Sequence, residues 1–414
     1  MLKPLDRRPT LCLGARAWLP ALCVVALVAA CGGGGSSATD TASPSSAPGT
    51  SALAVGPITG FGSVIVNGVR FDETNARVTD DDDAVHGREE LRLGMIAEVL
   101  SAGILSDATG SHGTASAVRF GSELIGPVAS VAADGKSIVV LGETVNITAT
   151  TIFDERIVGG VTGLKAGTSV VEVHAVLDAA AGTYTATRIE PKANAPFFKL
   201  KGTVAQIDKT AHTFKIGSGT DTISYDAIAA AVPAGFDNGM LVRVKLQTTQ
   251  IAGRWVATGI ANGARKVENH AEAELEGAIT ATTFGVDKKF SVNGIAVDAS
   301  QATFPNGTTG IVLGARVEVK GSAAGGVVIA ARVSIETEVA REQRGFELHG
   351  ALSALDTTAK TFSLRGITVN YGGASVEFRK GTAADLANGK NLEVKGTRSS
   401  DGATLLATRV SFEG

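Results

Sequence analysis

The chain has 414 residues and a formal net charge of −3, from 38 basic and 41 acidic side chains. Proteins that bind nucleic acids need clustered Lys and Arg to neutralise phosphates, so this mildly acidic balance argues against a nucleic-acid partner. Glycine is abundant, at 51 residues, while aromatic residues make up only 5% of the chain. Many glycines together with frequent Val, Ile and Thr favour short strands joined by tight turns.

Residues 1–30 predict a secretory signal peptide. Four basic residues precede the apolar stretch "WLPALCVVALVAA", which ends at Ala30. This stretch is too short to span a bilayer comfortably, and it ends in small residues, as the cleavage region of a signal peptide does. We therefore expect an exported protein.

The end of this segment, Val28-Ala29-Ala30-Cys31, resembles the lipobox of bacterial lipoproteins. The resemblance implies a diacylglycerol on Cys31, cleavage before it, and an acylated new N-terminus. Several acyl chains, at about 0.8 kcal/mol per buried CH₂, anchor a protein far more firmly than one chain. Gly32 stands where an aspartate signals inner-membrane retention in well-studied proteobacteria, so the resemblance implies the outer membrane, facing either the periplasm or the cell surface. The alternative is an ordinary signal peptide cut after Ala30, which leaves Cys31 free.

Residues 31–55 predict a flexible tether, because this Gly- and Ser-rich segment lacks the apolar mass to fold. Its reach is roughly 25–30 Å, enough to hold a domain clear of the lipid head groups. The other two cysteines, Cys12 and Cys23, leave with the signal peptide. The mature chain therefore cannot form an internal disulfide.

Three sequence anchors recur in constant order five times after the tether. A Gly-x-(Val/Ile/Leu) opening is followed by a Gly-x-x-Val-Glu-Val type strand and an Ala-x-Arg-(Val/Ile) type closing strand. Such self-similarity at a fixed period indicates a repeat architecture. The anchors predict repeat 1 (56–121), repeat 2 (122–194), repeat 3 (195–268), repeat 4 (269–340) and repeat 5 (341–414).

Each repeat has the strand pattern of a small β-barrel. Three alternating strands come first, then a variable segment with room for a helical turn, then two strands that form a second hairpin. Four repeats carry a two-residue turn between the second and third strands, for example Asn67-Gly68 and Arg365-Gly366, and Asn-Gly in this setting is a strong hairpin signal. This is the strand order of the five-stranded OB-fold barrel. The fold class expected is therefore all-β, with five tandem OB-like barrels, as beads on a string or as a packed array. A small open sheet or sandwich per repeat is the alternative.

A charge pattern accompanies the last two strands. A glutamate of the fourth strand and an arginine of the closing strand occur in four repeats, and repeat 3 has Arg243 and Gly259 at these places. Because both partners change together, we predict cross-strand ion pairs, each contributing about 0.2–1 kcal/mol. The predicted pairs are Glu98 with Arg119, Glu172 with Arg188, Glu318 with Arg332, and Glu393 with Arg409.

The repeat, with its opening "GPITGFGSVIVNGVRFD", its "L-x-x-G-M-x-x-E-V" strand and the lipobox, resembles a bacterial envelope family of unknown function. The resemblance implies tandem small β-barrel domains carried on lipoproteins. It covers nearly all of residues 56–414 and brings no activity and no functional residues.

Candidate sites are few. Asp80, Asp81, Asp82 and Asp83 are followed by His86, and their oxygens are suitable ligands for Ca²⁺, although the spacing of an EF-hand is absent. A solvated acidic loop is the favoured interpretation, and a calcium site the alternative. The six histidines show no zinc-ligand spacing, so no cofactor is predicted.

Tyr184 and Trp255 occupy equivalent places in repeats 2 and 3. They favour packing in a core or between repeats, and stacking on a sugar or base is the alternative.

Because no nucleophile, base and orienting group stand close together, we expect no enzyme. We expect a membrane-anchored, non-enzymatic binding or scaffold module. Its partner would be an envelope protein or surface polymer, and its oligomeric state is left open. The alternative is a small-ligand or Ca²⁺ binder that uses the Asp-rich loop or grooves between repeats.

Overall fold

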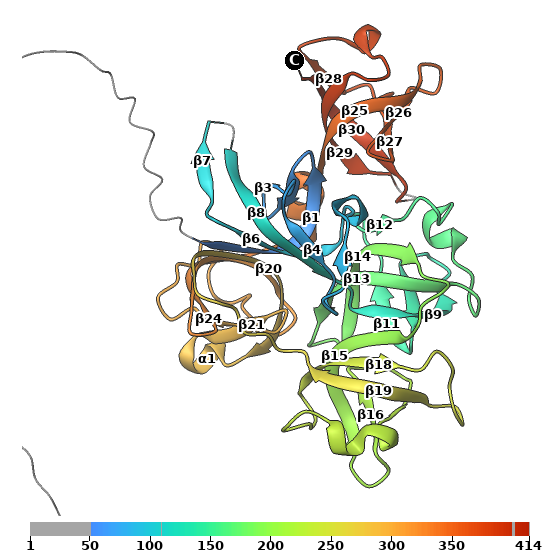
Figure 1. Cartoon of the computed structure of the whole chain (residues 1–414), viewed down its shortest axis with the longest axis vertical. Coiled ribbons are helices and arrows are strands. Elements are labelled where there is room, and N and C mark those ends of the chain that lie inside the picture. The colour runs from blue at the N-terminus through green and yellow to red at the C-terminus, as the bar shows by residue number, and fades with distance from the viewer. Residues whose placement is uncertain (1–50, 109, 400–401, 414) are drawn as a thin grey trace, which may run out of the picture. The chain divides into compact units, whose positions relative to one another are not determined.

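The computed structural model describes residues 51–108, 110–399 and 402–413, and its ordered elements are almost all β-strands (Figure 1). The signal peptide, the lipobox with Cys31 and the tether up to residue 50 lie outside the described residues. Among the helices of the described segments, none has the length and hydropathy needed to cross a membrane.

Repeat 1 contains eight strands and one 3-10 turn: β1 (Ala52–Phe61), β2 (Val64–Val66), β3 (Val69–Asp72), β4 (Arg77–Thr79), β5 (Val85–His86), η1 (Arg88–Glu90), β6 (Ile96–Ser101), β7 (Leu105–Asp107) and β8 (Gly110–Gly121). Repeat 2 contains β9 (Leu124–Val131), β10 (Ser137–Val140), β11 (Glu143–Asn146), β12 (Ile152–Phe153), η2 (Gly160–Gly163), β13 (Val170–Asp178) and β14 (Thr183–Pro191). Repeat 3 contains β15 (Phe198–Asp208), β16 (Thr213–Ile216), β17 (Ile223–Ser224), η3 (Asp226–Ala231), β18 (Leu241–Leu246) and β19 (Trp255–Asn262).

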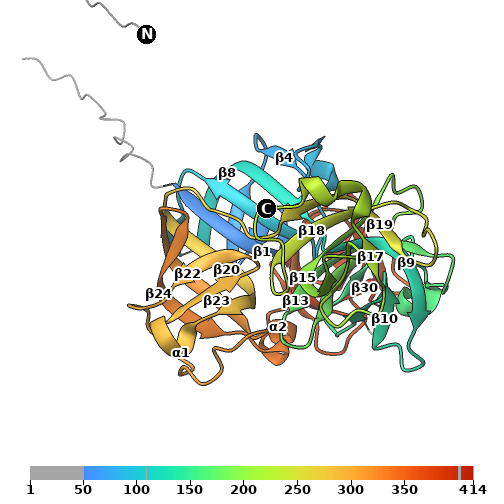
Figure 2. The same ribbon diagram turned by 90° about the horizontal axis from the view of Figure 1, so that it is seen from below.

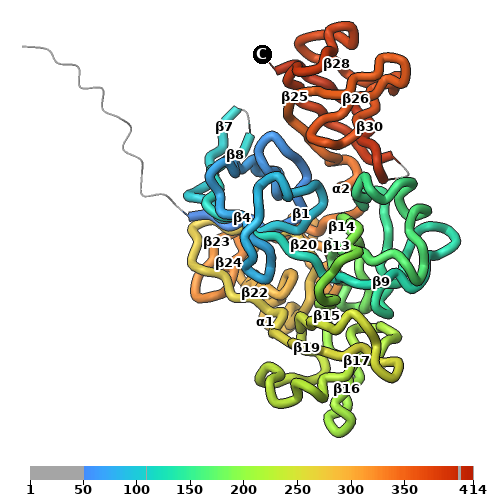
Figure 3. The backbone as a smooth tube through the Cα atoms, turned by 45° about the vertical axis from the view of Figure 1, so that its right-hand side comes forward, coloured from blue at the N-terminus to red at the C-terminus, as the bar shows by residue number. Residues whose placement is uncertain are grey.

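Repeat 4 contains β20 (His270–Thr282), α1 (Phe284–Asp287), β21 (Lys289–Val292), β22 (Ile295–Asp298), β23 (Arg316–Ala324) and β24 (Val327–Ile335). The short helix α2 (Glu338–Arg344) leads into repeat 5 and spans the boundary predicted between residues 340 and 341. Repeat 5 contains β25 (Phe346–Asp356), β26 (Thr361–Leu364), β27 (Ile367–Asn370), β28 (Glu377–Arg379), η4 (Ala383–Asp385), β29 (Asn391–Arg398) and β30 (Thr404–Phe412). The backbone trace in Figure 3 follows the repeats from blue to red.

The repeated unit is a small closed five-stranded barrel. In repeat 5, β25 pairs with β26, β26 with β27, β27 in parallel with β30, β30 with β29, and β29 with β25 again. Repeat 2 closes in the same way through β9, β10, β11, β14 and β13. The parallel step is possible because the long variable segment carries the chain across the barrel between the third and fourth strands.

The tight turns predicted from the sequence are confirmed by the backbone. Asn67 and Gly68 have φ of 53° and 79°, and Arg365 and Gly366 have φ of 50° and 79°. Both residues of each turn are therefore left-handed, as the primed turns of two-residue hairpins require. In each case the flanking residues pair directly, Val66 with Val69 and Leu364 with Ile367.

The predicted tether boundary is wrong by four residues. Strand β1 already begins at Ala52, and its first four residues are 1–5% exposed. They pair with β6 on one side and with β20 of repeat 4 on the other. This short apolar segment is ordered because both edges of its backbone are hydrogen-bonded.

The repeats pack against one another through shared strands. Figure 2 shows β1 beside β20, where Ala52–Val55 pair in parallel with Glu272–Leu275. Farther along, β1 pairs with β25 of repeat 5, and β9 of repeat 2 pairs with β15 of repeat 3. The hydrophobic clusters follow the same grouping: one joins repeats 2 and 3, one joins repeats 1 and 5, and one joins repeat 4 to β1. Of the two arrangements left open by the sequence, the described residues adopt the packed one.

Candidate functional site

The predicted cross-strand ion pairs are wrong, because the structure gives each of these side chains another partner. The partners are Arg265 for Glu98, Asp83 for Arg119, Lys192 for Glu172, Asp154 and Glu190 for Arg188, Lys320 for Glu318, the Ser334 hydroxyl for Arg332, Lys395 for Glu393, and Glu377 for Arg409. The glutamates and arginines lie on adjacent strands, as expected, but they do not bind each other.

The reason is hairpin register. In repeats 2, 4 and 5 each glutamate lies opposite the residue two positions beyond the arginine, for example Glu318 opposite Ser334. Register is set by loop length and by the bulge in each hairpin, and a single charge pair is too weak to change it. In repeat 1, Glu98 does lie opposite Arg119, but Arg119 turns toward Asp83.

The acidic loop (residues 80–83) binds cationic side chains of repeat 3. The Asp81 carboxylate accepts hydrogen bonds from Lys199 at 3.0 and 3.1 Å. Asp82 lies 2.9 Å from Lys245, and Arg243 lies 3.4 Å from Asp81. The Lys199 side chain is only 3% exposed, so its charge is neutralised inside the contact.

These contacts remove the basis for a calcium site at the acidic loop. Ca²⁺ needs several free oxygen ligands, and the protein's own cations already take up the carboxylates of Asp81 and Asp82. Asp80 is held by the His86 ring at 3.1 Å and by the backbone N–H groups of Asp82 and Ala84. The loop is therefore a docking element between repeats 1 and 3.

The same contacts explain why repeat 3 departs from the glutamate pattern. Arg243 on β18 and its neighbours on β15 face the acidic loop, and Lys199 lies opposite Lys245 in the pairing of these strands. A glutamate at position 243 would face Asp81 and Asp82. The replacement of glutamate by Arg243 in repeat 3 is therefore explained by a contact with repeat 1, and not by the loss of an ion pair within repeat 3.

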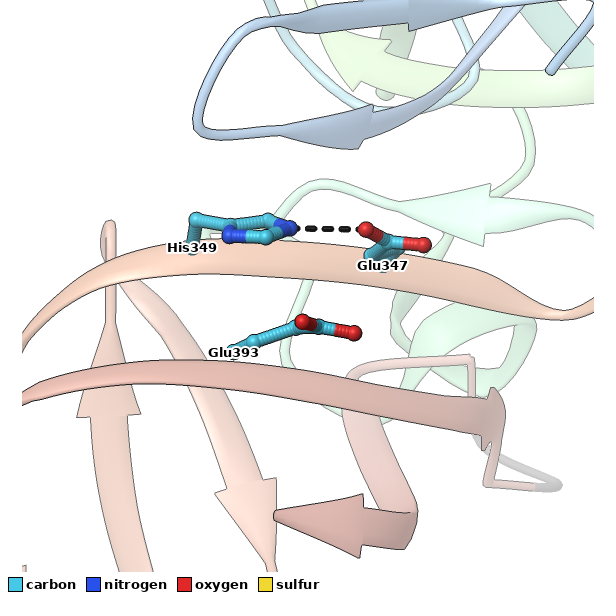
Figure 4. A group of neighbouring side chains, drawn as sticks. All are labelled: Glu347, His349 and Glu393. Carbon is cyan, nitrogen blue, oxygen red and sulfur yellow. Dashed lines mark hydrogen bonds and ion pairs between the residues drawn. The ribbon is translucent and has the colours of Figure 1, made fainter. Parts of the chain in front are cut away.

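A second charged cluster, shown in Figure 4, was not predicted from the sequence. Glu347 and His349 are two positions apart on β25 and therefore lie on the same face of the strand, and Glu393 lies on the neighbouring β29. His349 binds Glu347 through Nε2 and Glu413 through Nδ1, both at 2.7 Å. The motif "ELHG" opposite a glutamate-bearing strand is the signal that could have identified it.

This cluster has the ligand types of a metal site, but a protein cation occupies its centre. The Lys395 ammonium lies 2.8 Å from Glu347 and 3.6 Å from Glu393, and Arg70 of repeat 1 also binds Glu347. Burial disfavours a charged ring, but hydrogen bonds to the two carboxylates outweigh it and raise the pKa of His349. Burial alone would raise the pKa of Glu347, yet its bonds to His349 and Lys395 lower that pKa to about 2. The cluster is therefore an ionic contact between repeats 1 and 5.

Repeats 2 and 3 meet around a buried carboxyl group. Glu143 is 2% exposed, and its Oε2 has no hydrogen-bond partner among the described residues. Burial, with the nearby charge of Asp221, raises the pKa of Glu143 to about 8. The Asp221 carboxylate accepts a hydrogen bond from Trp255 Nε1 at 2.8 Å.

The two equivalent aromatic residues pack in this region, as the sequence predicts. Tyr184 is fully buried, and its hydroxyl donates to the Lys201 carbonyl of repeat 3 at 2.8 Å. Trp255 is 7% exposed and lies edge-on to Phe198 at 5.5 Å. Neither side chain is available as an open stacking surface for a sugar or base.

A cavity of about 320 Å³ lies where repeats 1, 2 and 5 meet, and we call it the arginine-lined cavity. Its lining includes five arginines and two glutamates, together with apolar side chains of all three repeats. The five arginines are Arg88, Arg92, Arg188, Arg365 and Arg398. The arrangement combines apolar surface with excess positive charge, which is the composition of a binding site for an organic anion.

Another cavity, of about 280 Å³, lies beside the acidic loop. It is also rich in cations, but most of these are paired: Arg243 with Asp81, Arg265 with Glu98, and Lys201 with Glu123. The arginine-lined cavity is therefore the stronger candidate for binding a ligand.

Three of these repeats match a known family. The family is described as a domain of unknown function (DUF5666), and the matched residues are 125–190, 276–334 and 349–411. These segments fall within repeats 2, 4 and 5. A comparison with curated proteins finds no match.

Proposed function

We propose that this chain is a lipid-anchored protein of the bacterial outer membrane, in which five OB-like barrels act together as one non-enzymatic binding or scaffold module. The strand order supports the OB-like assignment. The cycle of first, second, third, fifth and fourth strands, with a crossover before the fourth, is that of the OB-fold barrel.

The observation that carries the proposal is the pairing of β1 with strands of two distant repeats. Through Ala52–Val55 it joins repeat 4, and through Gly60 and Phe61 it joins repeat 5. The surfaces available to a partner are therefore composed of several repeats, and binding depends on the whole array. The lipobox at Cys31 and the Gly- and Ser-rich segment after it supply the membrane anchor and its spacer.

The anchor is tested by labelling cells that express the chain with an alkyne-bearing fatty acid. The wild type and Cys23→Ser, which changes a cysteine inside the signal peptide, should both incorporate the label. Cys31→Ser should not, and it should leave the outer-membrane fraction. Equal labelling of Cys31→Ser would contradict the lipoprotein assignment.

The scaffold role is tested by chemical cross-linking on intact envelopes, with an unrelated outer-membrane lipoprotein as control. A protein joined reproducibly to this chain and absent from the control supports a scaffold function. Recovery of the uncross-linked chain alone argues against a protein scaffold and leaves the binding of a ligand as its role.

A further inference from the structure

The arginine-lined cavity has two kinds of lining, which differ in exposure. Leu91, Leu93, Ile152, Phe153 and Leu405 are each between 1% and 6% exposed, so the buried lining is apolar. The arginines at positions 88, 92 and 365 are exposed and lie at the rim. Glu89 and Glu155 of the lining are exposed as well, so the rim carries three arginines and two glutamates. A ligand entering this cavity meets a rim of net positive charge first and apolar side chains beyond it.

The rim arginines keep charge available for a ligand. Within the described part of the chain, Arg88, Arg92 and Arg365 form no ion pair with a carboxylate. Arg188, in contrast, is committed to Asp154 at 2.7 Å and to Glu190. Guanidinium groups bind carboxylates and phosphates through paired hydrogen bonds, which are stronger than hydrogen bonds between neutral groups.

Arg365 is held in position before any ligand binds. Its Nε donates to the His349 carbonyl at 2.7 Å, and its guanidinium lies 5.8 Å from the centre of the Phe61 ring. Both contacts leave the terminal nitrogens of the guanidinium available. A side chain that is already oriented loses less entropy when it binds a ligand.

From this arrangement we propose that the arginine-lined cavity binds a small organic anion: an apolar body carrying a carboxylate or phosphate group. The body lies against Leu91, Leu93 and Phe153, and the anionic group lies at the rim between Arg88 and Arg365. The volume is at the lower end of the range for small-molecule sites. The proposal rests on the proposed function, because the cavity exists only while repeats 1, 2 and 5 are packed together.

The test is isothermal titration calorimetry of the full chain in detergent, with blank titrations into detergent alone. The probes are 2-naphthoate as an aromatic acid, decanoate as an acyl chain, 2-naphthalenemethanol as a neutral analogue, and inorganic phosphate. We expect one of the two organic acids to bind, and phosphate and the neutral alcohol to bind at least tenfold more weakly. Tighter binding of naphthoate indicates a free aromatic acid, and tighter binding of decanoate indicates a lipid-derived ligand.

Arg365→Gln should raise the Kd about tenfold, since it removes one charge-assisted contact. Arg88→Gln should weaken binding as well, and Arg254→Gln, at an exposed arginine that does not line the cavity, should not. Circular dichroism of each variant checks folding. Absence of binding by both acids, equal binding of the neutral alcohol, or an unchanged Kd in both rim variants would overturn the proposal. Fatty-acid labelling and cross-linking do not depend on this ligand, so such a failure is distinguishable from failure of the proposed function.

Discussion

Replacing Glu143 by glutamine should make the protein more stable above neutral pH and change its stability little in mild acid. Glu143 is buried, and its pKa is raised from 4.5 to about 8. A carboxyl group with a raised pKa binds more protons in the folded state than in the unfolded state. The stability of the wild type is therefore complete below pH 4.5 and falls as the pH rises toward 8.

The magnitude follows from the size of the shift. At about 1.4 kcal/mol per pKa unit, a rise from 4.5 to about 8 corresponds to a loss of about 5 kcal/mol across this interval. Glutamine has nearly the shape of the protonated glutamate and does not titrate. Glu143→Gln should therefore exceed the wild type by only about 1 kcal/mol at pH 5 and by about 4 kcal/mol at pH 8.

Trp255 provides a local probe, because it binds Asp221 at the same junction. The only other tryptophan is Trp18, which lies in the predicted signal peptide, so Trp255 is the one tryptophan of a chain that starts at residue 31. Urea unfolding followed by tryptophan fluorescence at pH 5, 6, 7 and 8 gives the free energy of unfolding. Asp221→Asn is the matched control: it keeps an oxygen acceptor for Trp255, removes the neighbouring charge, and should reduce the pH dependence only in part. Parallel curves for the wild type and Glu143→Gln would refute a protonated Glu143 in the folded state.

Three further results are expected, each from thermal or urea unfolding. Gly68→Ala should lower the free energy of unfolding by about 1 kcal/mol, because alanine is strained at a positive φ. Gly94 has a similar φ, but Gly94→Ala should lower it by about 1–3 kcal/mol more, because the new Cβ would lie 2.4 Å from the Thr187 carbonyl oxygen of repeat 2. Equal losses for the two variants would contradict this close approach. Arg243→Glu should destabilise by about 2 kcal/mol through repulsion from the acidic loop, and a change no larger than that of Arg254→Glu would count against the docking contact. The ionised His349 stabilises the wild type below pH 6.5, and this stabilisation is lost as the pH rises through the raised pKa of His349. His349→Gln should remove this pH-dependent part of the free energy of unfolding. The same pH profile in the variant and the wild type would argue against an ionised histidine at this site.

The sequence predicted the turns and the strand order within a repeat, but not the register of the last hairpin, on which the predicted ion pairs depended. Turn positions such as Asn67 and Gly68 follow from local backbone sterics, and the closing order of the strands follows from their spacing in the chain. Contacts between repeats could not be derived in this way. Lys199 reaches Asp81 across 118 residues, and the composition of neither segment identifies the other as its partner.

The tether boundary failed for the same reason. Alone, the segment "SALAV" looks too short and too small to be ordered, and it becomes a strand only because β6 and β20 provide partners on both sides. The arginine-lined cavity likewise draws its lining from three repeats. Neither feature exists in any single repeat, so no pattern within one repeat could have predicted it.

Differences between the copies are therefore more informative about function than their similarities. Positions that point into a barrel must be apolar in every repeat, because each barrel fills its own interior. Outward positions serve different neighbours, since five similar units packed into one array cannot all make the same contacts. Arg243 is the clearest case: the other repeats carry glutamate there, and in repeat 3 this position contacts Asp81 and Asp82 of the acidic loop. The "ELHG" motif of repeat 5 is another, because Glu347 binds Arg70 of repeat 1. Arg88 and Arg365 are exposed outward positions that form no ion pair with a carboxylate in the described part of the chain, and for that reason we assign them to a ligand.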